Sequence, residues 1–181
     1  MKLNNIEGLI VIDPKIFHDA RGYFFESFHT EKYRALGIET EFVQDNISVS
    51  NKGVLRGLHF QKPPYAQAKL VQVLAGIVYD VVVDLRSTSA TFGAHYGILL
   101  SAINKKQLYI PKGFAHGFLV LSDTAVFQYK CDAYYTAEAD SGIYYDDKDI
   151  AIEWPMSDNL IVSDKDKNLQ LFIDYQLNPS F

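Results

Sequence analysis

The chain has 181 residues, of which 48% are hydrophobic, and a formal net charge of -5 at pH 7. This length allows one sizeable core and predicts a single domain over residues 1–181. The acidic balance argues against bulk binding to nucleic acid or to an anionic membrane. The single cysteine, Cys131, rules out an intrachain disulfide and favours a reducing compartment.

Near the N-terminus, the apolar run 8–12 ends quickly at Asp13-Pro14. It is too short for the core of a signal peptide, and no small-residue cleavage site follows it. No stretch of the chain approaches the length of a membrane span. We therefore expect a soluble, cytoplasmic protein that binds neither membranes nor nucleic acid.

Short β-type runs, separated by turn residues at close intervals, dominate the rest of the chain. They predict strands at 9–12, 23–28, 69–74, 77–85, 96–100, 107–110, 118–121 and 126–134. One short helix is predicted, with Thr30 as its N-cap and Gly37 just past its end. The acidic stretches 146–149 and 164–166 are expected to be exposed loops. This pattern favours an all-β, antiparallel sandwich or barrel with a few short peripheral helices.

The first predicted hairpin has a two-residue turn at 75–76. It makes Lys69 and Asp80 diagonal neighbours on one face, within reach of a long side chain. Asp80 lies within an apolar strand, so it needs a partner if that face is buried. A structural ion pair between Lys69 and Asp80 is the simplest interpretation.

The second predicted hairpin turns at 122–123 and places His116 opposite Tyr129 and Phe118 opposite Phe127. The apolar match supports this register, although Ser-Asp is a weak turn sequence. A slip by one residue would send Tyr129 to the other face. Strand alternation also keeps Tyr129 and Tyr135 on one side.

Two histidines in a β-rich chain first suggest a metal site. Residues 111–116, P-K-G-F-A-H, resemble the second motif of the cupin superfamily, a jelly-roll barrel fold. The first cupin motif carries His-x-His and then Glu, whereas this chain has His59-Phe60-Gln61, followed by Lys69 and no suitable glutamate. Two imidazoles are fewer than the three protein ligands that catalytic zinc takes. The sequence therefore predicts no metal.

Seven segments between about residues 8 and 166 carry a wider pattern. They read R-G-x-F-x-E at 21–26, Q-D-N at 44–46, L-R-G-L-H-F-Q at 55–61, Q-x-K-L-V at 67–71, D-V-V-V-D-L-R at 80–86, P-x-G-F-A-H-G-F at 111–118 and S-D-K-D at 163–166. In joint order and spacing they resemble the dTDP-4-dehydrorhamnose 3,5-epimerase family of metal-free cupin enzymes. The resemblance implies a jelly-roll (cupin) barrel that acts without a metal or other cofactor.

The resemblance further implies a dTDP-linked 4-keto-6-deoxyhexose as substrate, converted to dTDP-4-dehydro-L-rhamnose for polysaccharide synthesis. The C4 ketone acidifies the protons on C3 and C5, so a base removes either of them to give an enolate. Reprotonation from the opposite face inverts that carbon. Such chemistry needs a base, an acid on the far side, and positive charge at the developing oxyanion.

By the same resemblance, His59 is the base and Tyr129 is the acid on the opposite face. Asp166 is the carboxylate that orients His59, although the residues alone make Asp164 an equal candidate. Lys69 stabilises the enolate oxygen.

Other family positions assist these residues. The resemblance places His116 close to Lys69 as a hydrogen-bond donor, and Asp80 would hold the Lys69 ammonium in place and keep it charged.

Substrate binding is also assigned by the resemblance. No glycine-rich phosphate cradle is present, so side chains hold the diphosphate, with Arg56 and Lys165 as the candidates. Further binding candidates are Arg21, Glu26, Gln44, Asp45, Asn46, Tyr135 and Asp140. Asp140 replaces the glutamate that the family usually has, so the charge is kept but the reach is shorter. Part of the nucleotide site comes from an adjacent subunit in the family, which implies a homodimer.

Three rival hypotheses remain at this point. An epimerase of the same fold acting at a single carbon predicts deuterium uptake at C3 or C5 but not both. A metal-dependent cupin oxygenase is disfavoured, because this chain lacks the metal ligands that such an enzyme needs. A non-catalytic sugar-binding module would not need a base, an acid and an oxyanion stabiliser together.

Overall fold

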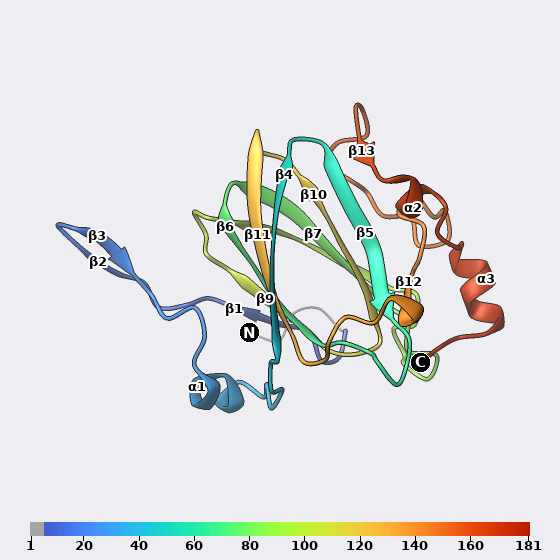
Figure 1. The fold of residues 1–181 in the computed structure, drawn as a ribbon, viewed down its shortest axis with the longest axis horizontal. Helices are drawn as coiled ribbons and strands as arrows, with labels where there is room; N and C mark the ends of the chain where they lie inside the picture. Colours follow the sequence, from blue (N-terminus) through green and yellow to red (C-terminus); the bar gives the residue numbers. More distant parts are fainter. Residues whose placement is uncertain (1–5) are drawn as a thin grey trace.

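The computed structural model describes residues 6–181, and most of its strands form two antiparallel sheets (Figure 1). The first sheet has the order β1 (Ile10–Ile12), β9 (Gln107–Ile110), β6 (Lys69–Ala75), β11 (Thr124–Cys131) and β4 (Gln44–Asn51). The second has the order β12 (Asp140–Gly142), β5 (Val54–Gln61), β10 (Phe114–Val120), β7 (Ile77–Asp84) and β8 (His95–Ser101), and β13 (Ile161–Val162) joins β5 in parallel. The predicted antiparallel jelly-roll fold is confirmed.

Helices are few and short. They are α1 (Thr30–Ala35), the 3₁₀ turn η1 (Ala137–Ala139), α2 (Asp164–Lys167) and α3 (Phe172–Leu177). The predicted helix is α1, but its N-cap is His29 and Thr30 is its first residue. Gly37 follows its end with φ +91°, a conformation that glycine adopts without steric cost. No helix within residues 6–181 is long and apolar enough to cross a membrane.

The main core lies between the two sheets, because alternate side chains of both point inward. Val71 and Phe127 from the first sheet meet Val82 and Phe118 from the second. The rings of Phe118 and Phe127 stack with centroids 4.2 Å apart. Full burial of one such side chain is worth about 1.5–3 kcal/mol.

Both predicted hairpins are wrong in their pairing. β6 pairs with β9 and β11, whereas β7 pairs with β8 and β10, so the turn at 75–76 carries the chain from one sheet to the other. The turn at 122–123 does the same between β10 and β11. Alternation predicts which side chains share an interior, but two facing sheets satisfy it as well as two paired strands. The apolar match of Phe118 with Phe127 is real, but it is a contact across the core.

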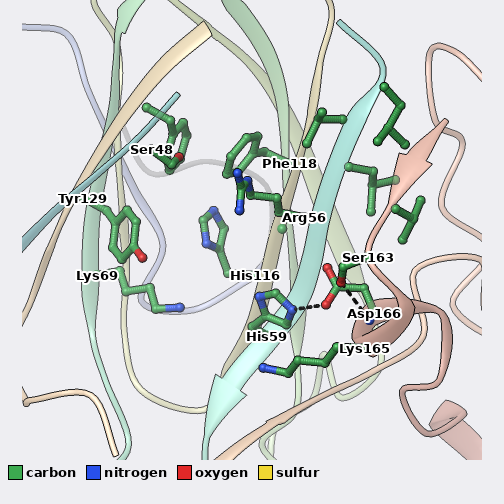
Figure 2. Close-up of a pocket in the computed structure, with 16 residues that line it drawn as sticks. Ser48, Arg56, His59, Lys69, His116, Phe118, Tyr129, Ser163, Lys165 and Asp166 are labelled. Carbon is green, nitrogen blue, oxygen red and sulfur yellow. Dashed lines mark hydrogen bonds and ion pairs between the residues drawn. The ribbon is translucent and has the colours of Figure 1, made fainter. Parts of the chain in front are cut away.

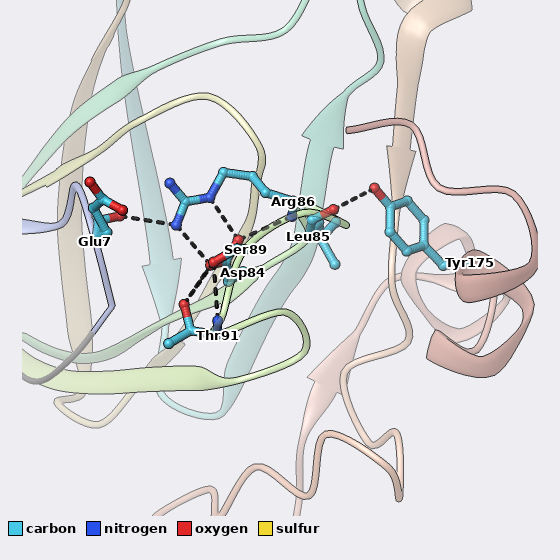
Figure 3. Close-up of polar contacts among 7 residues, drawn as sticks. All are labelled: Glu7, Asp84, Leu85, Arg86, Ser89, Thr91 and Tyr175. Atoms are coloured by element: carbon cyan, nitrogen blue, oxygen red, sulfur yellow. Dashed lines mark hydrogen bonds and ion pairs between the residues drawn. The ribbon is translucent and has the colours of Figure 1, made fainter.

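The outer face of the second sheet is covered by the C-terminal segment, which α3 anchors. Tyr175 donates from Oη to the carbonyl of Leu85 at 2.9 Å, beside a polar network around the buried Asp84 (Figure 3). Burial raises the pKa of Asp84, but hydrogen bonds from Arg86, Ser89 and Thr91 outweigh it and hold the pKa below its ordinary value. The network fixes the turn after β7.

The prediction of an exposed loop at 146–149 is wrong for Asp147, which is buried. Its Oδ1 accepts from the backbone N–H groups of Asp149 and Ile150, and its Oδ2 accepts from that of Phe172 at 2.8 Å. The carboxylate therefore fastens this loop to the start of α3.

A hairpin projects from the sandwich. It consists of β2 (Phe17–Asp19) and β3 (Gly22–Phe24), and Figure 1 shows it as an arm that extends beyond the two sheets. The predicted strand at 23–28 is thus shorter than expected and belongs to neither main sheet.

Candidate active site

A cavity of about 550 Å³ opens between the two sheets. Its lining includes His59 on β5, His116 on β10, and Lys69 and Tyr129 on β6 and β11 (Figure 2). Asp166 reaches it from α2. Four strands from the two sheets, together with α2, therefore bring the predicted catalytic candidates to one place.

His59 and Asp166 form a hydrogen-bonded pair. Nε2 of His59 lies 2.8 Å from Oδ1 of Asp166, and the backbone N–H of Gly57 donates to Oδ2 at 3.0 Å. Burial raises the pKa of Asp166, but the hydrogen bond and charge of His59, the N–H of Gly57 and the side chain of Ser163 outweigh it, so the pKa is lowered. Because a carboxylate accepts, Nε2 carries the proton and Nδ1 is left as the basic atom.

A bulge in β5 turns both Arg56 and His59 toward the cavity. Residues three apart in a regular strand lie on opposite faces. Here His59 pairs with His116 and Arg56 with Phe118, so β5 has one extra residue in this stretch. Gly57 adopts φ +131° in the bulge, and a Cβ there would lie 2.5 Å from the backbone of β10.

Tyr129 and Lys69 face His59 from the other sheet (Figure 2). Burial raises the pKa of Tyr129, aided by Cys131, while the charge of Arg56 opposes the rise. Burial lowers the pKa of Lys69, with Cys131, Asp140 and Asp80 acting the other way. The Lys69 ammonium lies 5.9 Å from the centroid of the Tyr129 ring. A neutral phenol and a cation therefore stand together.

His116 and Asp80 form a second pair. Nε2 of His116 lies 2.9 Å from Oδ2 of Asp80, whereas Oδ1 has no hydrogen-bond partner among the described residues. The predicted direct ion pair between Asp80 and Lys69 is wrong, because Asp80 pairs with His116 instead. The charge of Asp80 still acts on Lys69 from the facing sheet, where it raises the pKa of that ammonium. His116 pairs with Val82 across β10 and β7, which makes Asp80 its diagonal neighbour.

A second cavity of about 300 Å³ adjoins the first and shares His59, Lys69, Tyr129 and Lys165 with it. Its other polar side chains include four of the predicted binding candidates: Gln44, Asn46, Tyr135 and Asp140. Arg56 lines the larger cavity.

Three candidates lie outside both cavities within one chain. Arg21 is in the projecting arm and pairs with Asp19 at 2.5 Å. Glu26 pairs with Lys32. Asp45 points to the outer face of β4, where it pairs with Lys130.

Sequence reasoning missed several lining residues. Phe118 and Phe127 form an apolar wall, and Ser48 contributes a buried Oγ that has no partner among the described residues. Ser163 caps α2 by accepting from the backbone N–H of Asp166 at 3.1 Å. Its spacing to Asp166 is the signature of a helix N-terminus and could have identified this turn.

Metal ligands do not gather in this site. Within residues 6–181, no three His, Cys, Asp or Glu side chains lie close enough to hold a metal ion. Each of the two histidines is bound to a carboxylate instead.

Known proteins match the chain over most of its length. The sequence model of dTDP-4-dehydrorhamnose 3,5-epimerases matches residues 4–174. The dTDP-4-dehydrorhamnose 3,5-epimerase of Escherichia coli (strain K12) is 55% identical over 165 residues, 91% of this chain and 89% of that protein.

Solved structures agree. The dTDP-6-deoxy-D-glucose-3,5-epimerase RmlC from Legionella pneumophila Philadelphia 1, in complex with dTDP-4-keto-L-rhamnose, is 51% identical, has a TM-score of 0.92, and is matched over 98% of this chain and 96% of that chain. ChmJ, a 3'-monoepimerase from Streptomyces bikiniensis in complex with dTDP-quinovose, is 33% identical with a TM-score of 0.91, over 98% and 90%. The chain belongs to the dTDP-4-dehydrorhamnose 3,5-epimerase family.

Proposed function

We propose that this protein inverts C3 and C5 of dTDP-4-dehydro-6-deoxy-D-glucose and so makes dTDP-4-dehydro-L-rhamnose. One observation carries the proposal. His59 and Tyr129 come from opposite sheets and line the same cavity, with the Lys69 ammonium beside them. A sugar ring between the two sheets would meet a base on one face and an acid on the other.

Nδ1 of His59 takes the proton from C3, and the electrons of the C–H bond move into the C3–C4 bond and onto O4. Lys69 stabilises the resulting enolate oxygen, and His116 lies beside it in the cavity. Oη of Tyr129 then gives its proton to C3 from the opposite face, which leaves a phenolate. Proton exchange with water returns His59 and Tyr129 to their starting states, and the same cycle inverts C5.

Asp166 makes this base possible through its two oxygens. One holds the Nε2–H of His59 and the other holds the N–H of Gly57, so the ring is kept in one tautomer and one orientation. The lowered pKa of Asp166 keeps it ionised, and its negative charge stabilises the imidazolium that forms.

The diphosphate binds to Arg56 and Lys165, which both line the larger cavity. Gln44, Asn46 and Tyr135 extend the site through the second cavity. The protein acts in the cytoplasm, where the lone, buried Cys131 stays reduced.

The enzyme works as a homodimer. The arm exposes Phe17, Tyr23 and Phe24, each between 49 and 65% exposed, and β4 is a sheet edge with Ile47 and Val49 about as exposed. Unpaired edges and apolar patches of this kind are covered by partners. The arm therefore packs on a second copy and delivers Arg21 and Glu26 to its site.

Mixing two inactive variants tests this arrangement. In a mixed dimer of Arg21→Ala with His59→Ala, one site has both its own His59 and an intact arm from its partner. After exchange of subunits, activity should return to about a quarter of the parent, since half of the dimers are mixed and each has one intact site. No recovery would contradict the shared site.

Incubation with the 4-keto-6-deoxyglucose nucleotide in deuterated water tests the reaction itself. We expect deuterium at both C3 and C5 by NMR; uptake at one carbon alone would favour the single-carbon reaction that the name of ChmJ describes. His59→Ala should abolish exchange at both carbons. Tyr129→Phe should impair net inversion more than initial proton removal, and equal loss of both would count against its role.

A further inference from the structure

Asp140 lines the second cavity at the start of β12, beside Lys165, which lines both cavities. Its Oδ2 accepts a hydrogen bond from Oη of Tyr135 at 3.0 Å and forms an ion pair with Nζ of Lys165. The three residues come from the segment after β11, from β12 and from α2. One carboxylate oxygen thus connects three separate parts of the rim.

Lys165 is the cation in this cluster, and Figure 2 shows its ammonium reaching beneath His59 toward the cavity. Burial lowers the pKa of Lys165, but the hydrogen bond and charge of Asp140, together with Tyr135 and Asp166, outweigh it and raise the pKa. The ammonium is therefore charged, and Asp140 offsets that charge.

Exposure decides how firmly this pair holds. The Lys165 side chain is 54% exposed, so water screens the ion pair and its strength is modest. A diphosphate carries more negative charge than a carboxylate, so it can displace Asp140 from Lys165.

We infer that Asp140 competes with the diphosphate of the substrate for Lys165 and thereby speeds the release of nucleotide products. This inference rests on the proposed function, in which Lys165 binds the diphosphate. When the nucleotide sugar enters, Lys165 turns from Asp140 to the phosphate oxygens. When product leaves, Asp140 recaptures the ammonium. Asp140 is a positioning residue, because it acts through Lys165 and not on the reacting carbons.

Asp140→Asn is the informative substitution. The amide keeps the volume and an oxygen that accepts from Tyr135, but it loses the charge that holds Lys165. We expect dTDP to bind about 2- to 5-fold more tightly by calorimetric titration, the range of an exposed ion pair. KM for the nucleotide sugar should fall in the same direction. Mere structural damage would weaken binding, so unchanged or weaker binding in a folded variant overturns the inference.

Two further variants separate competition from a general charge effect. Asp164→Asn removes one negative charge from the same helix, but Asp164 is 96% exposed and pairs with Lys167, so dTDP affinity should not change. In a Lys165→Met background, Asp140→Asn should tighten binding less than it does in the parent. Equal tightening in both backgrounds, or tightening by Asp164→Asn, would overturn the inference.

Asp140→Glu restores the charge and should return the affinity for dTDP toward that of the parent. Failure of the proposed function gives a different result, since the parent would then exchange no protons with deuterated water. Thermal melting of each variant shows that the fold is kept.

Discussion

Asp166→Asn is the sharpest test of the base. Asp166 accepts two hydrogen bonds, from Nε2 of His59 and from the N–H of Gly57, whereas the amide of asparagine has one oxygen. If that oxygen keeps Gly57, the NH₂ group faces Nε2 and forces the proton of His59 onto Nδ1. The ring then presents a donor to the substrate and cannot accept a proton.

The loss should be large. A positioned general base contributes about 100- to 10,000-fold to rate, so we expect proton exchange at C3 and C5 to fall by that factor. If the oxygen instead keeps His59, the buried N–H of Gly57 loses its partner, which costs about 1–3 kcal/mol of unfolding free energy. That corresponds to about 2–4 °C of melting temperature per kcal/mol for a chain of this size.

Deuterium incorporation by NMR and thermal melting measure these two quantities on the same preparation. Asp164→Asn is the matched control, because it removes the same charge from α2 at an exposed position. Exchange within tenfold of the parent at both carbons would refute the role of Asp166.

Three other perturbations follow from the same site. Burial lowers the pKa of Lys69 from 10.5, so the midpoint of the alkaline decline of kcat should lie below that pH. Lys69→Met should abolish this decline and reduce activity by about 100- to 1,000-fold. Burial raises the pKa of Cys131 to about 11 from 9.0. Between these values the unfolded state loses the thiol proton while the folded state keeps it, so the free energy of unfolding measured in urea should fall as pH rises. Cys131→Ala should make this dependence on pH weaker. Gly117→Ala places a Cβ 2.6 Å from the carbonyl oxygen of Arg56, so it should cost about 1–3 kcal/mol and slow exchange, and an unchanged melting temperature would contradict the close approach of β5 and β10.

Local patterns in the sequence predicted most strands and the faces of their side chains. They failed for β4, where alternation is inverted: Ile47 and Val49 point outward, whereas Ser48 lines the larger cavity and Asn46 the second one. Hydrophobicity alone predicts a turn for a strand whose inward-facing side chains are polar. In β5, Gly57 and the bulge hid the strand in the same way.

Pairings between distant segments could not be derived from local patterns. The resemblance selected Asp166 over Asp164, and the structure gives the physical reason. Residues two apart in a helix lie on nearly opposite sides, so α2 buries Asp166 and leaves Asp164 in water. The true partner of Asp80, His116, is adjacent only after β7 and β10 pair.

The two residues proposed to exchange protons with the sugar, His59 and Tyr129, belong to different sheets of the sandwich. The gap between them therefore depends on what fills the interior, and beside the site this filling is the stacked pair of Phe118 and Phe127. A larger or smaller side chain at either position would widen or narrow the space for the hexose while His59 and Tyr129 themselves stay unsubstituted. In this architecture, the size of the core side chains beside the site therefore sets the distance between the two sheets, and evolution can change which sugar ring fits and which carbon is inverted through these residues.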